Sequence, residues 1–417
     1  MIRLRNGIVS VLDIGSSKIA CLIARIEADK PPVILGIGHQ LSQGIRSGTL
    51  VDIKQAENAI LAAVHAAEKM ANIAIEDIVV NLSGTALSSQ TSSFDIDIAG
   101  HEVTIADINR ILDQARGQVN QQENYILHTI PYGYVIDNTP GITSPLGMFG
   151  HQLKSQVHIV SAPVSVVRNL QHCLAKCSLN CQDVVATGYA AGLAALTADE
   201  RQLGTVMLDI GGGNTDIAIF ESANLIYTGS VPVGGIHITK DIARGLSTSL
   251  SYAERVKNLY GSILSTIQDD GITLDIPQDD STDSLTDNEQ EISHIARSAL
   301  VGIIRPRVEE IFEMAAAHLH EQGFEKLSGY RLVLTGGTSQ LSGMKELAAE
   351  MLHAQTRLSR PQGLEGLAES TKGPGFSATV GLIHYVQHAL PASAFSEKEG
   401  KTPAILTRFF RWFQQNF

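Results

Sequence analysis

The sequence predicts an α/β protein built from two related halves, and three observations support this class. Thr205–Phe220 reads as an apolar strand, a turn of three consecutive glycines and a second apolar strand. Val11–Ile26 repeats this layout near the N-terminus, with an Asp and a Gly at matching positions. Leu332–Met344 adds a late strand that ends in two glycines before a helix. At 417 residues the chain is too long for one core, so at least two domains are expected.

The two strand–turn–strand units carry the groups of an anion and metal site. Consecutive glycines let backbone N–H groups converge and let an anion approach closely. Asp13 and Asp209 end the first strand of each unit, where a carboxylate can hold Mg²⁺ through water. Either unit alone also fits a solvated Gly-rich hairpin, but the repeat favours a shared site. The candidate phosphate-binding residues in the two turns are Gly15, Ser16, Ser17, Lys18, Gly211, Gly212, Gly213, Asn214 and Thr215.

These two turns, followed by the late strand–Gly-Gly–helix turn, resemble the actin and heat-shock-chaperone ATPase superfamily. In that fold two ribonuclease-H-like halves close on one nucleotide. The whole chain resembles the FtsA family of bacterial cell-division proteins more closely, because IPYGYVID at 130–137 and TSPLGMFG at 143–150 are similar to that family's inserted domain. The resemblance implies an actin-like fold that binds ATP and Mg²⁺, with an inserted small α+β domain and a C-terminal amphipathic helix. No β-rich peptide-binding domain follows, which disfavours a chaperone.

The resemblance also assigns later residues to the nucleotide. Gly234 and Gly235 open a predicted helix, Ile238–Leu246, whose first N–H groups are expected to face phosphate. Glu254 and Lys257 share a helix face and would contact ribose and adenine, although a surface salt bridge fits equally well. Gly336, Gly337 and Thr338 close the site. Because Val184–Thr197 holds no carboxylate or amide to position a water, slow or absent ATP turnover is expected.

Other segments alternate between helix and strand patterns. An acidic stretch, Ser265–Glu291, has nine carboxylates and no Lys or Arg, so part of it is predicted to be a mobile loop. Cysteines at 173, 177 and 181 are predicted to be core or semi-exposed thiols rather than metal ligands. The main predicted elements are helices Ile53–Met70, Thr104–Gln121, Ala162–Leu179, Ile292–Leu319 and Phe376–Gln387, and strands Ile78–Leu82, Gln90–Ile98, Tyr125–Ile136 and Gln156–Ala162.

Two arginines in the predicted helix Ile292–Leu319 are candidates for partner binding. The resemblance places there the pocket for the acidic C-terminal tail of FtsZ, the tubulin-like filament protein. Arg307 falls on the arginine of the family's IxPRxxE-like pattern, and Arg305 lies two residues before it. Arginine is the expected partner of a carboxylate. The alternative for both is an ordinary helix-surface arginine.

The last fourteen residues, Ala404–Phe417, predict an amphipathic helix after a flexible linker at 391–403. Such a helix is too short to span a bilayer and reads as an interfacial membrane anchor; docking on a protein surface is the alternative. No run of about 18 apolar residues exists in the chain, so no spanning segment is expected. The apolar face holds Leu406, Phe409, Phe410, Phe413 and Phe417, with Trp412 at its edge and Arg408 and Arg411 supplying positive charge.

Together these features predict an ATP-binding adaptor that polymerises and holds FtsZ filaments to the inner face of the cytoplasmic membrane at the septum, with later division proteins as partners. The net charge of −12 argues against nucleic acid as a partner. The alternatives are a pilus-assembly-type relative that binds a short peptide and a sugar or acetate kinase. The predicted domains are 1–84 with 159–202 (1A), 85–158 (1C), 203–240 with 330–390 (2A), 241–329 (2B), linker 391–403 and helix 404–417.

Overall fold

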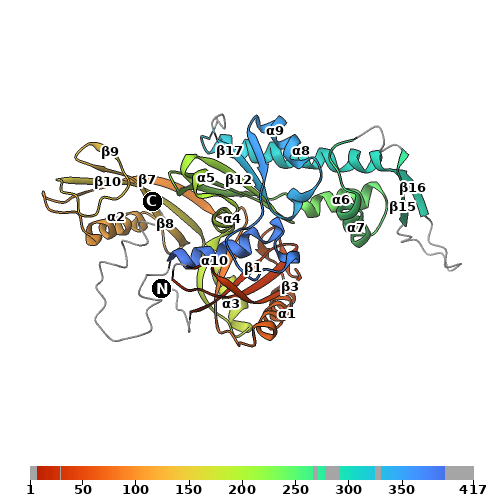
Figure 1. Ribbon diagram of the computed structural model, residues 1–417, viewed down its shortest axis with the longest axis horizontal. Coiled ribbons are helices and arrows are strands. Elements are labelled where there is room, and N and C mark those ends of the chain that lie inside the picture. Colours follow the sequence, from red (N-terminus) through yellow and green to blue (C-terminus); the bar gives the residue numbers. More distant parts are fainter. Residues whose placement is uncertain (1–6, 29, 266–270, 278–291, 325–329, 390–417) are drawn as a thin grey trace.

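The computed structural model describes residues 7–28, 30–265, 271–277, 292–324 and 330–389. It contains two five-stranded sheets with helices between and around them, and a separate four-stranded sheet (Figure 1). The predicted linker and C-terminal helix lie outside the described residues, as does most of the acidic segment. Among the helices that are described, none is long and apolar enough to cross a membrane.

The first sheet has the strand order β11-β6-β1-β2-β3. Helices α1 (Ile53–Ala71) and α3 (Val164–Lys176) pack against it and enclose a core that includes Cys173 and Cys177. Its three central strands are buried along most of their length because helices cover both faces. The strands are β1 (Ile8–Ile14), β2 (Lys18–Arg25), β3 (Val33–Leu41), β6 (Asp77–Leu82) and β11 (Asn180–Ala186), and a small hairpin joins β4 (Ile45–Arg46) to β5 (Thr49–Leu50).

The second sheet repeats the first, with the order β14-β13-β12-β17-β18. In each sheet the first three strands in sequence are antiparallel neighbours, and the last two join in parallel on the side of the first strand. This repeat confirms the predicted duplication, because the hairpins of Asp13 and Asp209 occupy equivalent places. The strands are β12 (Thr205–Ile210), β13 (Thr215–Glu221), β14 (Asn224–Val231), β17 (Arg331–Thr335) and β18 (Gln355–Leu358).

Two helices cross between the sheets. α4 (Thr187–Ala195) follows the last strand of the first sheet, and α10 (Ser377–Ala389) packs across it. A Cβ at Gly381 would lie only 1.7 Å from the carbonyl oxygen of Ala190, so the two backbones touch at this crossing. A short helix, α5 (Ala198–Leu203), leads from α4 into the second sheet.

The inserted domain projects from the first half, at the left of Figure 1. Its sheet has the order β7-β10-β8-β9, and α2 (Ile105–Gly117) packs on one face over a separate apolar core. This is the predicted small α+β domain, with each predicted element close to its expected position; strand β9 was not predicted. The strands are β7 (Ser88–Asp97), β8 (Asn124–Ile136), β9 (Thr139–Ile142) and β10 (Gln152–Pro163).

Two buried histidines tie the inserted domain to the rest of the molecule. Nε2 of His128, on β8, accepts a hydrogen bond from the N–H of Ala186 at 3.0 Å, at the end of the first sheet. His158, on β10, bonds the carbonyl oxygen of Leu225 in the second half through Nδ1 at 2.9 Å and Ser89 through Nε2 at 2.7 Å. Burial lowers the pKa of His128 to about 3 and that of His158 to about 4, so both rings are neutral.

The remaining elements extend the second half to the right of Figure 1. Ile292–Ala296 forms β16, paired with β15 (Thr273–Pro277), so the helix predicted from Ile292 begins only at Arg297. The prediction was wrong there because Ile292 and Ile295 fit a helical spacing as well as a strand edge. The helices are α6 (Gly235–Gly245), α7 (Leu250–Tyr260), α8 (Arg297–Glu321) and α9 (Met344–Leu352), with a short 3₁₀ turn, η2 (Gly337–Gln340).

Candidate functional site

A cleft of about 940 Å³ opens where the β1–β2 and β12–β13 turns meet α6, α7 and η2. Both halves of the duplicated fold therefore contribute to one site. Thr215 and Gly234 are not among the lining residues. The predicted residues that line it are Asp13, Gly15, Ser16, Ser17, Lys18, Asp209, Gly211, Gly212, Gly213, Asn214, Gly235, Glu254, Lys257, Gly336, Gly337 and Thr338.

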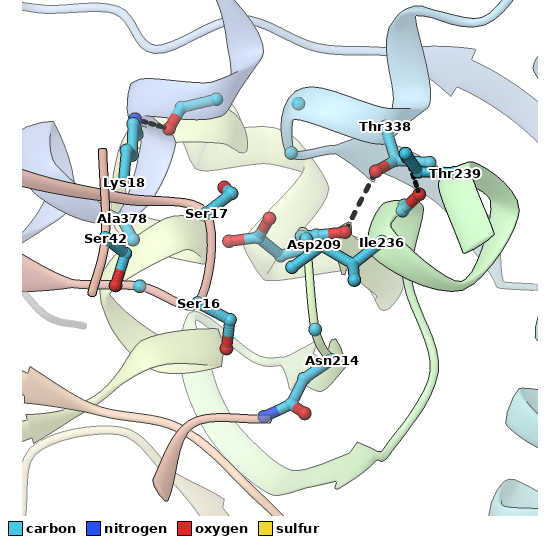
Figure 2. A pocket seen from close by; sticks show the side chains of 18 of the residues that line it. Ser16, Ser17, Lys18, Ser42, Asp209, Asn214, Ile236, Thr239, Thr338 and Ala378 are labelled. Carbon is cyan, nitrogen blue, oxygen red and sulfur yellow. Dashed lines mark hydrogen bonds between the residues drawn. The ribbon is translucent and has the colours of Figure 1, made fainter. Parts of the chain in front are cut away.

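The two turns have the same hydrogen-bonding pattern and face one another across the cleft (Figure 2). The N–H of Gly15 bonds the carbonyl of Lys18, and the N–H of Gly211 bonds that of Asn214, both at 3.0 Å. A Cβ at Gly213 would lie 2.6 Å from Ser16 Oγ, so only glycine permits this approach. Within the described chain, the amides at 16, 17, 212 and 213 bond no protein acceptor. Four free amides converging from two turns form a suitable anion cradle.

Of the two carboxylates Asp13 and Asp209, Asp13 is the one fixed by hydrogen bonds. Asn81 donates to its Oδ1 at 2.8 Å and Thr379, at the start of α10, donates to its Oδ2 at 2.7 Å. Asn81 also accepts from the N–H of Ile14 and donates to Thr187 at 3.1 Å. This network fixes Asp13 at the end of β1, so its charge faces the cleft without a rotamer search.

Asp209 is the free carboxylate. No described residue donates a hydrogen bond to it, and its side chain points between the two turns toward Ser17 (Figure 2). Burial, followed by the charges of Asp216 and Asp13, raises its pKa well above the ordinary value, while Lys18 acts the other way. A cation in the cleft would relieve this repulsion. Among the described residues no three His, Cys, Asp or Glu side chains are placed to hold a metal directly, so the arrangement fits a Mg²⁺ bound through water.

The position of Asp209 leaves no room for a side chain at Gly336. Its φ is +88°, and a Cβ there would lie 2.4 Å from Asp209 Oδ1 and 2.5 Å from the carbonyl oxygen of Ile210. The adjacent Gly337 has no atom within 4 Å of an added Cβ. Thr338 Oγ1 donates to the carbonyl of Gly211 at 2.9 Å, which joins η2 to the second turn.

Lys18 lies at the edge of the cleft on the α10 side. Its Nζ donates to the carbonyl of Gly375 and lies 3.4 Å from the ring centroid of Phe376, a cation–π contact. Burial lowers the pKa of Lys18, while Asp13 and Asp209 act the other way. The lysine is thus positioned by the 3₁₀ turn η4 (Pro374–Phe376) that precedes α10, beside the amide cradle rather than inside it.

The first N–H groups of α6, which were expected to face phosphate, already have hydrogen-bond acceptors within the protein. The N–H groups of Gly235 and Ile236 donate to the carbonyls of Gly211 and Gly212 at 3.0 and 2.8 Å, so they support the second turn instead of awaiting an anion. Gly234 lies behind that turn, because its Cβ would meet Gly211 O at 2.6 Å. Thr215 is fully buried and bonds the carbonyl of Val233.

Glu254 and Lys257 form a partly buried pair at the cleft wall. Lys257 Nζ donates to the Gly235 carbonyl at 3.0 Å, to Thr239 at 2.8 Å and to Glu254 at 2.7 Å, which uses all three of its hydrogens. Burial alone would raise the pKa of Glu254, but the Lys257 charge brings it below its usual value. Lys257 therefore fastens α6 to α7, and Glu254 is the more exposed member of the pair.

Sequence reasoning missed several polar residues that the fold brings to the cleft. Ser83 directly follows β6 in the first half, donates to both oxygens of Asp216 at 2.8 Å and accepts from Asn214 at 3.0 Å. Burial raises the pKa of Asp216 to about 6, although Ser83 lowers it. The position of Ser83 at a strand end was the only available signal, because its partners lie in the other half.

The two predicted partner-binding arginines lie outside this cleft, on α8. Arg305 Nε contacts Glu309 at 2.8 Å, one helical turn later. Arg307 contacts Asp241 of α6 and Glu310 of its own helix. Both guanidinium groups therefore already have carboxylate partners within the chain.

Comparison with known proteins places this fold and cleft in a family. The family model described as "Cell division protein FtsA" matches residues 206–381, and that described as "SHS2 domain inserted in FTSA" matches residues 84–161. The cell division protein FtsA of Agrobacterium fabrum is 38% identical over 99% of this chain and 96% of its own length. The chain belongs to the FtsA family of cell division proteins. FtsA of Pseudomonas aeruginosa is 36% identical and that of Escherichia coli K12 is 29% identical, each over 97% of both chains.

Solved structures show the same fold at lower identity. The PilM–PilN type IV pilus biogenesis complex matches with a TM-score of 0.63 and 17% identity over 92% of this chain and 99% of that one. MreB5 of Spiroplasma citri bound to ADP matches with a TM-score of 0.52 and 13% identity over 91% and 95%. The predicted actin-like fold with its inserted domain is thereby confirmed for this FtsA-family chain.

Proposed function

We propose that this FtsA-family protein binds ATP with Mg²⁺ in the cleft, self-assembles, and tethers FtsZ filaments to the inner face of the cytoplasmic membrane at the septum, where it recruits later division proteins. The observation that carries this proposal is near full-length similarity to FtsA proteins together with a cleft built from both turns. The domain assignment 1A, 1C, 2A, 2B, linker and terminal helix is part of the same proposal.

The ATP assignment is supported by chemistry within the cleft. The free amides of the two turns suit phosphate, and Asp209 suits a water-bound Mg²⁺ next to it. The MreB5 structure, which has the same fold, is bound to ADP. Turnover is expected to be slow, because the group that α4 presents to the cleft is the Thr187 hydroxyl, which Asn81 already contacts.

The ATP proposal is tested by titrating protein with a fluorescent ATP analogue in the presence and absence of Mg²⁺. Asp209→Asn should weaken the Mg²⁺-dependent part of the binding. Glu221→Gln, an acidic residue at the end of β13 outside the cleft lining, is the matched control. Equal affinities with and without Mg²⁺ in the wild type would contradict the metal assignment.

The FtsZ assignment is tested with a peptide of the C-terminal tail of FtsZ from the same organism. Wild-type protein should bind it in the micromolar range, Arg307→Glu should abolish binding, and Arg305→Glu reports on the more exposed neighbour. No binding by wild type that binds ATP normally would leave an actin-like ATPase with another partner, and the pilus-type and kinase alternatives would then be tested.

The membrane assignment rests on residues outside the described structure, Leu406, Phe409, Phe410, Trp412, Phe413, Phe417, Arg408 and Arg411. Deleting 404–417 should abolish pelleting with anionic liposomes and leave ATP binding unchanged. Pelleting of the truncated protein at the wild-type level would show that another surface binds lipid.

A further inference from the structure

Arg307 is held from two sides by carboxylates of its own chain. Its Nε and Nη2 donate to the two oxygens of Asp241, the second at 3.1 Å, and its Nη1 donates to Glu310. Asp241 lies on α6, sixty-six residues earlier in the sequence. The hydrogen bonds that Arg307 donates to Asp241 are the main reason that the pKa of Arg307 is raised. The pair is at the surface, with the Arg307 side chain 27% and the Asp241 side chain 22% exposed.

Asp241 occupies the edge of the guanidinium that an external carboxylate would use. The Nε–Nη2 edge presents two parallel N–H groups, which is the geometry that binds a carboxylate with both oxygens. Glu310 takes part of a second edge. An acidic peptide that approaches Arg307 therefore meets a group whose best recognition edge already holds the same kind of ligand.

The contact is not needed to hold α6 against α8. Ile238 and Ile242 of α6 are buried in the same apolar core as Ile304 and Val308 of α8. Buried aliphatic side chains supply most of the free energy of such packing, whereas a partly exposed ion pair contributes little. Removing the Asp241 charge should thus leave the helices in place and free the arginine.

We propose that Asp241 is an internal competitor for Arg307, an autoinhibitory carboxylate that an acidic partner peptide must displace to bind. This inference rests on the proposed role of Arg307 in binding the FtsZ tail. Glu310 assists Asp241 from the other side. The affinity of the surface for an acidic peptide is accordingly set below what a free arginine would give.

The test measures binding of the FtsZ tail peptide to full-length wild type, Asp241→Asn and Glu309→Gln. Asn keeps the size of Asp241 but cannot pair with the guanidinium as a charge, so the peptide should bind roughly three- to tenfold more tightly. Glu309→Gln removes an equal charge from the partner of Arg305 on the same helix, and it should change affinity less than Asp241→Asn does. Circular dichroism and ATP binding report whether each variant is folded.

The outcomes separate the inference from the proposed function. If wild type binds and Arg307→Glu does not, but Asp241→Asn binds more weakly than wild type, Asp241 orients the arginine and the inference is wrong. If Asp241→Asn and Glu309→Gln strengthen binding equally, the effect is general charge and the inference is also wrong. If neither wild type nor Asp241→Asn binds, the proposed role of Arg307 itself fails.

Discussion

Alanine substitution of the two adjacent glycines in the Gly336-Gly337 turn should affect different properties of the protein. At Gly336 the new methyl meets Asp209 Oδ1 at 2.4 Å and Ile210 O at 2.5 Å, with φ at +88°. With ψ at 159°, this backbone conformation is essentially restricted to glycine and costs another residue about 1–3 kcal/mol, and overpacking adds about 1–3 kcal/mol. Gly336→Ala should therefore lower the free energy of unfolding by roughly 2–6 kcal/mol.

Gly337→Ala is the matched control. Its Cβ would meet no protein atom within 4 Å, and the residue lines the cleft. We expect its unfolding free energy to stay within about 0.5 kcal/mol of wild type, while ATP affinity falls by about tenfold, because the methyl intrudes on the ligand.

Urea denaturation followed by circular dichroism measures stability, and titration with a fluorescent ATP analogue measures affinity. A Gly336→Ala protein as stable as wild type would refute the steric argument. Equal loss of stability in both variants would show that the turn, rather than the contact with Asp209, is sensitive.

Three other predictions concern charge and packing. Burial places the pKa of His158 near 4 in the folded protein, below its ordinary 6.5, so the unfolded chain takes up the proton first as pH falls. The contribution of His158 to stability is therefore full above pH 6.5 and is lost as pH falls toward 4. The loss is on the order of 2 kcal/mol by pH 5. The raised pKa of Asp216, about 6, has the opposite effect and favours folding as pH falls through 6. Because Asp216 is intact in both proteins, comparing the pH–stability profiles of His158→Gln and wild type should isolate the contribution of the histidine. Identical profiles would refute its role. Gly381→Ala should unfold the protein at lower urea than wild type, since its methyl collides with the backbone of α4, whereas Gly302→Ala, on the exposed face of α8 with nothing within 4 Å, should raise stability by about 0.5–1 kcal/mol. Lys18→Met should leave stability unchanged or higher and weaken ATP analogue binding at least tenfold, and unchanged affinity would exclude Lys18 from the site.

The fold could be predicted because its main signals are local. Each hairpin can be recognised from two apolar runs around a Gly-containing turn. Asp13 and Asp209 hold matching positions in the two hairpins, which relates the halves without any knowledge of contacts. The strand at Ile292–Ala296 could not be predicted with the same certainty, because its assignment depends on pairing with Thr273–Pro277 rather than on its own spacing.

The site could be predicted as a set of residues more readily than as a set of roles. Most named positions reach the cleft, because a strand end and a Gly turn fix where the backbone goes. Whether a donor is free depends on distant partners: Lys257 is saturated by Gly235 and Thr239, and Arg307 by Asp241, and these pairs join segments that no sequence periodicity connects.

Helix α6 connects the second turn of the cleft to the Arg307 contact on α8. Its first turn is bonded to the carbonyls of Gly211 and Gly212, and Asp241 lies six residues further, about 9 Å along its axis. A displacement of about 1 Å at Asp241 would take its 3.1 Å bond to Arg307 beyond hydrogen-bonding range. We therefore expect a change in the shape of the second turn to alter how tightly Asp241 holds Arg307, so that occupancy of the cleft would affect α8 through α6.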